Sequence, residues 1–241
     1  MAVMVDEPAP TSLQSLLLWI VAAIVAVDCV WAAFSGFQID GLAYLGLAAI
    51  SAALFAGAWF YSNVRPDQRL CAMLFGTGFL CAFSAAFSAL NYMLLTVAGP
   101  RIDDLLAAFD QSLGLHWPAL VQSAADHPMV NTILAVAYVS LLPQIAALVV
   151  ALGLFGRWRT IYSLCLAVAI SAALTVAFWT AFPSFGPFTV YQLDPALASR
   201  TILVVDAGYV QSLVPLRPTG RAGSRRTRSR ASSPFHPSMP F

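Results

Sequence analysis

Long apolar stretches, separated by polar or Pro/Gly clusters, dominate the pattern of the chain. They run through residues 12–34, 41–62, 70–98, 129–154 and 160–182. Each is longer than the roughly 18 apolar residues that a helix needs to cross the hydrocarbon core of a bilayer. The pattern therefore predicts an all-α, polytopic membrane helix bundle with about five transmembrane helices.

The segment between the third and fourth stretches has a different, amphipathic pattern. Its apolar residues recur at helical spacing, at Ile102, Leu105, Leu106, Phe109 and Leu113 and again at Trp117, Leu120, Val121 and Ala124. This repetition predicts two short helices that lie on the membrane surface.

Two prolines and a glycine follow the fifth stretch directly. Pro183, Gly186 and Pro187 stand in the string FPSFGPF. Proline removes a backbone donor and glycine tolerates turn geometry, so the last span is expected to end there. Further on, in the segment 191–217, the apolar run TILVVDAGYV around Asp206 is too short to cross a membrane, and we expect a surface hairpin or helix.

The composition agrees with a membrane domain. Of the 241 residues, 60% are hydrophobic and 10% are charged, whereas soluble domains are roughly half apolar and about a quarter charged. We therefore expect one membrane domain over residues 1–217. The remainder, 218–241, is rich in arginine, serine and proline without apolar periodicity, which is typical of a disordered tail.

Charge in the loops predicts the orientation. Two short loops carry pairs of arginines, Arg65 with Arg69 and Arg157 with Arg159. By the positive-inside rule these loops are cytoplasmic, which places the N-terminus inside and residues 99–128 and 183–241 outside. The first stretch follows Asp6 and Glu7 rather than a basic segment, so we expect a retained helix, with a cleaved signal peptide as the alternative.

Asp28 is an ionisable residue inside the first predicted span. Burial of a carboxylate in a membrane is unfavourable without a partner, so a functional site is one hypothesis. The other is a solvated or hydrogen-bonded carboxylate packed inside the bundle, with Asn91 as a neighbour.

Asp103 and Asp110 are the candidate site residues of the first surface helix. Their spacing of seven places them on nearly the same side of a helix, as paired acid/base carboxylates or metal ligands require. A solvated face is the alternative, with Asp103 and Asp104 favoured in the first helical turn.

The remaining polar residues and the cysteines give weaker indications of a functional site. His116 and His127 stand beside Trp117 and Pro128 and suit interface positions or helix caps better than ligands. Arg217 can bind a phosphate bidentately or can be an exposed loop residue. The four cysteines lie in apolar runs without ligand spacing, so neither a disulfide framework nor a zinc site is indicated, and no metal or cofactor is predicted.

Several motifs taken together resemble a known family. The pattern D-x-x-x-x-x-x-D-x-x-x-G-x-x-W runs from Asp103 through Asp110 and Gly114 to Trp117, and it is followed by AYVSLLPQ, GRWR, FPSFGP and the LR of Arg217. This arrangement resembles the type 2 phosphatidic acid phosphatase superfamily, in the branch that includes inositol phosphorylceramide synthase. The resemblance covers roughly residues 99–217.

The resemblance implies an activity and its residues. In that family a six-helix core carries, just outside the membrane, a Ser-Phe-Pro-Ser-Phe-His-Ala motif and a second histidine with an aspartate. One histidine attacks phosphorus to form a phosphohistidine, and the other protonates the leaving group. The resemblance thus implies a lipid-phosphate or phosphoinositol substrate drawn from the membrane, with Asp103, Asp110 and Arg217 as candidate site residues.

The printed sequence departs from the family after Arg217. Neither histidine motif is present, and His236, in PFHP, does not match. We hypothesise that the chain is truncated or frameshifted there. If the third base of each codon is read with the next two, permitted codons from Arg228 onward allow Leu-Glu-Gly-Ile-Val-Ser-Phe-Pro-Ser-Phe-His-Ala-Val, which contains the missing motif.

Two functions remain open at this point. The chain is either a membrane phosphatase or phosphotransferase that is catalytically incomplete as printed, or a noncatalytic membrane subunit or scaffold that binds lipid or a partner protein. Clustered arginines also suit nucleic acid, but an outward-facing tail excludes that partner from the prediction. No pattern specifies the oligomeric state.

Overall fold

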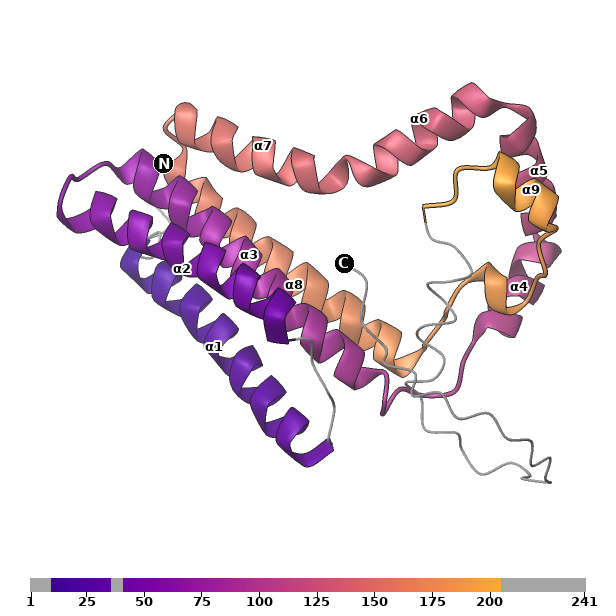
Figure 1. Cartoon of the computed structure of the whole chain (residues 1–241), viewed down its shortest axis with the longest axis horizontal. Helices are drawn as coiled ribbons and strands as arrows, with labels where there is room; N and C mark the ends of the chain where they lie inside the picture. Colours follow the sequence, from indigo (N-terminus) through magenta and orange to yellow (C-terminus); the bar gives the residue numbers. More distant parts are fainter. Residues whose placement is uncertain (1–9, 36–40, 205–241) are drawn as a thin grey trace, which may run out of the picture. The chain divides into compact units, whose positions relative to one another are not determined.

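The computed structural model describes residues 10–35 and 41–204 (Figure 1). These residues form helices and connecting loops, and no strand occurs among them. The prediction of an all-α, polytopic helix bundle is therefore confirmed. Several residues discussed above lie outside the described ranges, namely Asp206, Arg217, His236 and the tail 218–241.

The helices follow the hydrophobic pattern closely. The chain begins with three long helices, α1 (Pro10–Ser35), α2 (Gly41–Asn63) and α3 (Gln68–Leu94). Two short helices follow, α4 (Asp103–Ser112) and α5 (Trp117–Asp126), which confirms the two helices predicted from the amphipathic repeat. The remaining elements are α6 (Pro128–Val139), α7 (Leu141–Leu154), α8 (Trp158–Ala181), the 3₁₀ helix η1 (Pro187–Thr189) and α9 (Pro195–Arg200).

Four of the described helices, α1, α2, α3 and α8, are each long and apolar enough to cross a membrane. The count rises to five only if α6 and α7 together form one span. Many large apolar side chains of these helices are exposed, among them Trp19, Phe34 and Leu174. Exposure of such side chains suits a protein whose solvent is lipid.

The apolar stretch 129–154 forms two helices, α6 and α7, which are bent by 50° at a break at Ser140. Pro143 explains the break. It has no N–H for the carbonyl of Val139, and its ring would clash with that carbonyl in a continuous helix. The chain restarts instead: Gln144 donates its backbone N–H to the Ser140 carbonyl at 2.9 Å and its side-chain amide to the Ser140 hydroxyl at 2.6 Å. The length of the apolar stretch alone does not predict the break between α6 and α7.

The described residues fall into two compact units. The first contains α1, α2, α7 and nearly all of α3 and α8, and the second contains α4, α5, α6, η1, α9 and the adjoining ends of α3 and α8. In the second unit α5 packs against α6 and α9, and α4 contacts η1.

The core of the first unit forms around α3. Phe75 and Phe79 of α3 are buried with Tyr162 of α8, and α1 joins through Gln14, whose amide donates to the Tyr162 hydroxyl at 2.6 Å. Small residues let the helices approach closely: a Cβ on Gly76 would lie 2.5 Å from Cγ2 of Ile161. Close approach at small residues is the usual packing mode of helices in membranes.

Candidate functional site

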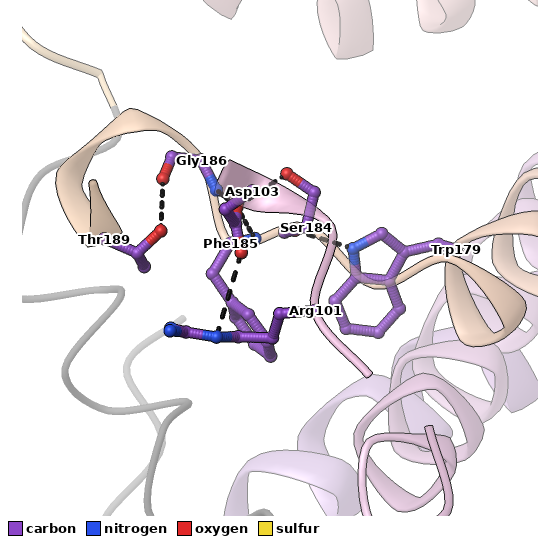
Figure 2. Close-up of polar contacts among 7 residues, drawn as sticks. All are labelled: Arg101, Asp103, Trp179, Ser184, Phe185, Gly186 and Thr189. Atoms are coloured by element: carbon purple, nitrogen blue, oxygen red, sulfur yellow. Dashed lines mark hydrogen bonds and ion pairs between the residues drawn. The ribbon is translucent and has the colours of Figure 1, made fainter. Parts of the chain in front are cut away.

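The carboxylate of Asp103 joins the start of α4 to the loop that follows α8 (Figure 2). Its Oδ1 atom accepts three hydrogen bonds, from the Ser184 hydroxyl at 2.8 Å, the Phe185 N–H at 2.8 Å and the Gly186 N–H at 2.9 Å. The residue is only 5% exposed. Hydrogen bonds to an ionised acceptor are about twice as strong as neutral ones, so this carboxylate holds the FPSFGPF loop firmly.

The loop has its own internal geometry. Gly186 has φ +86° and ψ −180°, a conformation that is open to glycine and strained for other residues. The Trp179 indole donates to the Ser184 carbonyl at 2.9 Å, and the Thr189 hydroxyl donates to the Gly186 carbonyl at 2.9 Å (Figure 2). These contacts turn two successive backbone N–H groups toward Asp103.

Backbone hydrogen bonds extend the same contact. The Gly99 N–H donates to the Thr180 carbonyl at 3.1 Å, and the Ile102 N–H donates to the Pro183 carbonyl at 3.1 Å. A Cβ on Gly99 would lie 2.8 Å from the Ala181 carbonyl oxygen, so the close approach of the two segments requires glycine there. The segment that enters α4 and the segment that leaves α8 therefore form one hydrogen-bonded unit.

Arg101 adds a positive charge beside the carboxylate. Its Nε lies 4.0 Å from Asp103 Oδ2, and its side chain is 40% exposed. Within the described part of the chain, Oδ2 is buried and accepts no hydrogen bond. The helix dipole also favours a negative charge in the first turn of α4. The site thus contains a buried carboxylate, Asp103, whose Oδ1 accepts three hydrogen bonds and whose Oδ2 accepts none. The partly exposed guanidinium of Arg101 lies next to it.

Asp110 lies in a different environment from Asp103. It is exposed, and seven residues of helix separate the two by about 10 Å along the axis. The contacts of the Asp103 carboxylate are made instead with Arg101 and the loop after α8. No three His, Cys, Asp or Glu side chains gather into a metal-binding group in the ranges 10–35 and 41–204. The catalytic roles of Asp103, Asp110 and Arg217 stay predictions.

The two histidines stand at the ends of α5. His116 occupies the N-cap position, and His127 occupies the C-cap position with its Nδ1 2.8 Å from the Ser123 carbonyl oxygen. The rings of His116 and Tyr191 are in edge contact, with centroids 5.8 Å apart. These positions agree with the interpretation as helix-end residues.

An aromatic cluster near α5 was not predicted from the sequence. The Trp117 ring contacts Phe188 and Tyr191, with centroids 5.1 and 6.0 Å apart, and the Gln111 amide donates to the Tyr191 hydroxyl at 3.0 Å. The cluster connects α4 and α5 to η1 and to the chain just beyond it. Gln111 and Tyr191 are 80 positions apart, so no local spacing reveals their contact.

Asp28 lies in α1 and is 7% exposed. Its Oδ1 atom and the Oδ1 atom of Asn91 are both buried without a hydrogen-bond partner among the described residues. These two oxygens therefore do not take part in the pairing suggested by the sequence.

Comparisons with known proteins give one finding. No curated protein and no solved structure matches the chain. A family model described as the PAP2 superfamily matches residues 104–233, a little over half of the sequence. The matched range starts directly after Asp103 and includes the rest of α4, all of α5 and the FPSFGPF loop. The chain therefore belongs to the PAP2 superfamily, the superfamily of type 2 phosphatidic acid phosphatases.

Proposed function

We propose that the protein is a multi-pass membrane protein of the lipid-phosphate phosphatase or phosphoinositol transferase type, on the inositol phosphorylceramide synthase-like branch. One observation carries the proposal: the Asp103 carboxylate fixes the FPSFGPF loop, and the family match covers that loop. Apolar helices suit a protein whose substrate is itself a membrane lipid. The arginine pairs support a cytoplasmic N-terminus, with the loop on the outer side.

In this proposal Asp103 is a positioning residue. Its three hydrogen bonds keep the loop in one conformation at the end of α8. Arg101 stands beside the loop with an accessible guanidinium, a group suited to a phosphate oxygen, and Arg217 would supply a second one. Such cations stabilise the charge that develops on a transferring phosphoryl group.

We further propose that the protein is catalytically incomplete as printed. The sequence contains neither the Ser-Phe-Pro-Ser-Phe-His-Ala motif nor the second histidine with its aspartate. His116 and His127 are at helix ends and do not match those motifs. The membrane domain would then comprise 1–217, and the tail 218–241 would be the product of a shifted frame.

Phosphate release tests both parts of this proposal. The chain as printed and a chain continued in the shifted frame of its own gene are expressed in the same membranes. Each is supplied with a short-chain phosphatidic acid and, separately, with a phosphoinositol donor and a lipid alcohol acceptor. We expect the printed chain to match a mock membrane and the continued chain to release phosphate or transfer phosphoinositol. Activity of the printed chain would contradict its incompleteness.

A noncatalytic subunit or scaffold is the second candidate. The observation that favours it is the exposed apolar surface of α4, formed by Leu105, Phe109 and, just after the helix, Leu113. Such a face suits a lipid surface or a partner protein. A partner that copurifies in fixed stoichiometry from native membranes, and is lost on Phe109→Ser substitution, would support this function.

A further inference from the structure

A cavity of about 390 Å³ lies between helices of the first unit, whereas Asp103 belongs to the second. Its walls come from α1, α2 and α3. The α3 wall consists of small apolar side chains, those of Ala82, Ala85, Ala86 and Ala89. This volume is in the range of small-molecule sites and far exceeds the roughly 30 Å³ of one water molecule.

Asp28 is the ionisable carboxylic acid in the cavity wall. The residue is 7% exposed, and within the described ranges its Oδ1 accepts no hydrogen bond. Ser51, which also lines the cavity, donates its hydroxyl to the Leu47 carbonyl of its own helix at 2.8 Å. A buried acceptor without a donor is strongly unfavourable, so the cavity is suited to an occupant that supplies one.

The described helices that line the cavity, α1, α2 and α3, offer no cation near Asp28. Neither α1 nor α2 contains Lys, Arg or His, and the sequence contains no lysine at all. In α3 the basic residue is Arg69, which stands in the first turn, thirteen residues before Ala82. That separation is about 20 Å along the helix axis. The three helices that line the cavity therefore supply no positive partner for Asp28.

We propose that this cavity binds a cationic amphiphile, a protonated primary amine on a single aliphatic chain. The ammonium donates to Asp28 Oδ1, and the aliphatic chain lies against the alanines of α3. A charge-assisted hydrogen bond satisfies the buried carboxylate, and apolar walls favour the chain over a cluster of water molecules. The proposal does not depend on catalysis, because the cavity and the Asp103 loop belong to different units.

Protection of Cys29 from alkylation tests the proposal. Cys29 is exposed and lines the cavity, whereas Cys81, on α3, is not among the lining residues and serves as an internal reference. The protein is purified in an uncharged maltoside detergent, treated with N-ethylmaleimide, and the labelled peptides are quantified by mass spectrometry. Dodecylamine should slow alkylation of Cys29 without slowing that of Cys81. The neutral 1-dodecanol should give no protection at the same concentration.

Three variants locate the effect. Asp28→Asn should weaken dodecylamine protection about tenfold or more, the change that corresponds to loss of one charge-assisted hydrogen bond. Asp104→Asn removes an exposed carboxylate elsewhere and should change nothing. Ala85→Leu narrows the cavity with Asp28 intact and should also weaken protection, which keeps the test decisive if Asp28→Asn does not fold.

Each contrary outcome overturns the proposal. Equal protection by 1-dodecanol would show a neutral lipid pocket without recognition of a cation. Undiminished protection in folded Asp28→Asn or Ala85→Leu would place the amine elsewhere. Equal slowing of Cys29 and Cys81 would show a general effect of the amine on the detergent micelle.

Discussion

The carboxylate of Asp103 accepts a hydrogen bond from the backbone N–H of Gly186 at 2.9 Å, across 83 positions of the chain. Both residues are required for this contact. Asp103 supplies a charged acceptor at the first turn of α4, and Gly186 adopts the positive φ that turns its N–H toward that acceptor. The conformation of the loop after α8 is therefore stabilised by Asp103, a residue from a distant part of the sequence.

Substitution of Asp103 should loosen the loop. Asp103→Ala leaves the N–H groups of Phe185 and Gly186 without their acceptor, which we expect to destabilise the protein by about 1–3 kcal/mol. Asp103→Asn should have a smaller effect because an amide oxygen still accepts. Thermal unfolding in detergent measures the loss, and hydrogen exchange over 182–190 locates it. Asp110→Asn, at the exposed position, is the matched control and should stay within about 0.5 kcal/mol of the parent.

Gly186→Ala tests the backbone conformation separately from the carboxylate. A Cβ there would meet no atom within 4 Å, so crowding makes no contribution. The positive φ should nevertheless destabilise the loop by about 1–3 kcal/mol. Gly46→Ala is the control, because Gly46 is also uncrowded but lies within α2, where alanine is the better helix former. Equal unfolding temperatures for the two variants would contradict the loop geometry.

Gly76→Ala should disrupt the contact between α3 and α8. The added Cβ would lie 2.5 Å from Cγ2 of Ile161, and overpacking of this kind costs about 1–3 kcal/mol. Shortening Ile161 should relieve the clash with the new Cβ. The double variant Gly76→Ala with Ile161→Ala should therefore lose less stability than the sum of the two single variants. Gly57→Ala, which meets only the end of the Leu74 side chain at 3.1 Å, should be tolerated better. Strict additivity in the double variant would argue against the contact.

Pro143→Ala should restore continuity between α6 and α7. Alanine provides an N–H at position 143 that can donate to the Val139 carbonyl, so amides over 141–145 should exchange more slowly and helical ellipticity should rise. Pro128→Ala is the control, since Pro128 is the first residue of α6, where proline fits without loss of a helical hydrogen bond. Unchanged exchange in Pro143→Ala would show that proline is not the cause of the break.

The sequence predicts the helices far better than the contacts between them. Apolar length and amphipathic spacing correctly predicted the long helices and the pair α4 and α5, because both signals are local. The break at Ser140 was missed since its cause, Pro143, lies inside an apolar run. Asp103 and the FPSFGPF string were each singled out, but their contact depends on tertiary structure. The same holds for Trp117 with Tyr191, which no spacing connects.

The predictions about charged residues divide in the same way. Asp28 was recognised as unusual from its place in an apolar run, and the structure confirms its burial. Asn91, the neighbour suggested from the sequence, does not donate a hydrogen bond to Oδ1 of Asp28. Hydropathy shows that both residues lie in apolar helices, but it does not show in which direction their side chains point. The orientation inferred from the arginine pairs and the role of Arg217 stay predictions.

The most direct measurement is the DNA sequence of the gene from the codon for Arg217 to well beyond that for Phe241. We predict that the shifted frame encodes the Ser-Phe-Pro-Ser-Phe-His-Ala motif, then a sixth apolar span and the second histidine. That result would make the intact gene product an outward-facing lipid phosphotransferase and the printed tail a frameshift product. A shifted frame that lacks the histidine motif, or that reaches an early stop codon, would contradict the proposal and leave a PAP2-superfamily membrane protein without its catalytic histidines.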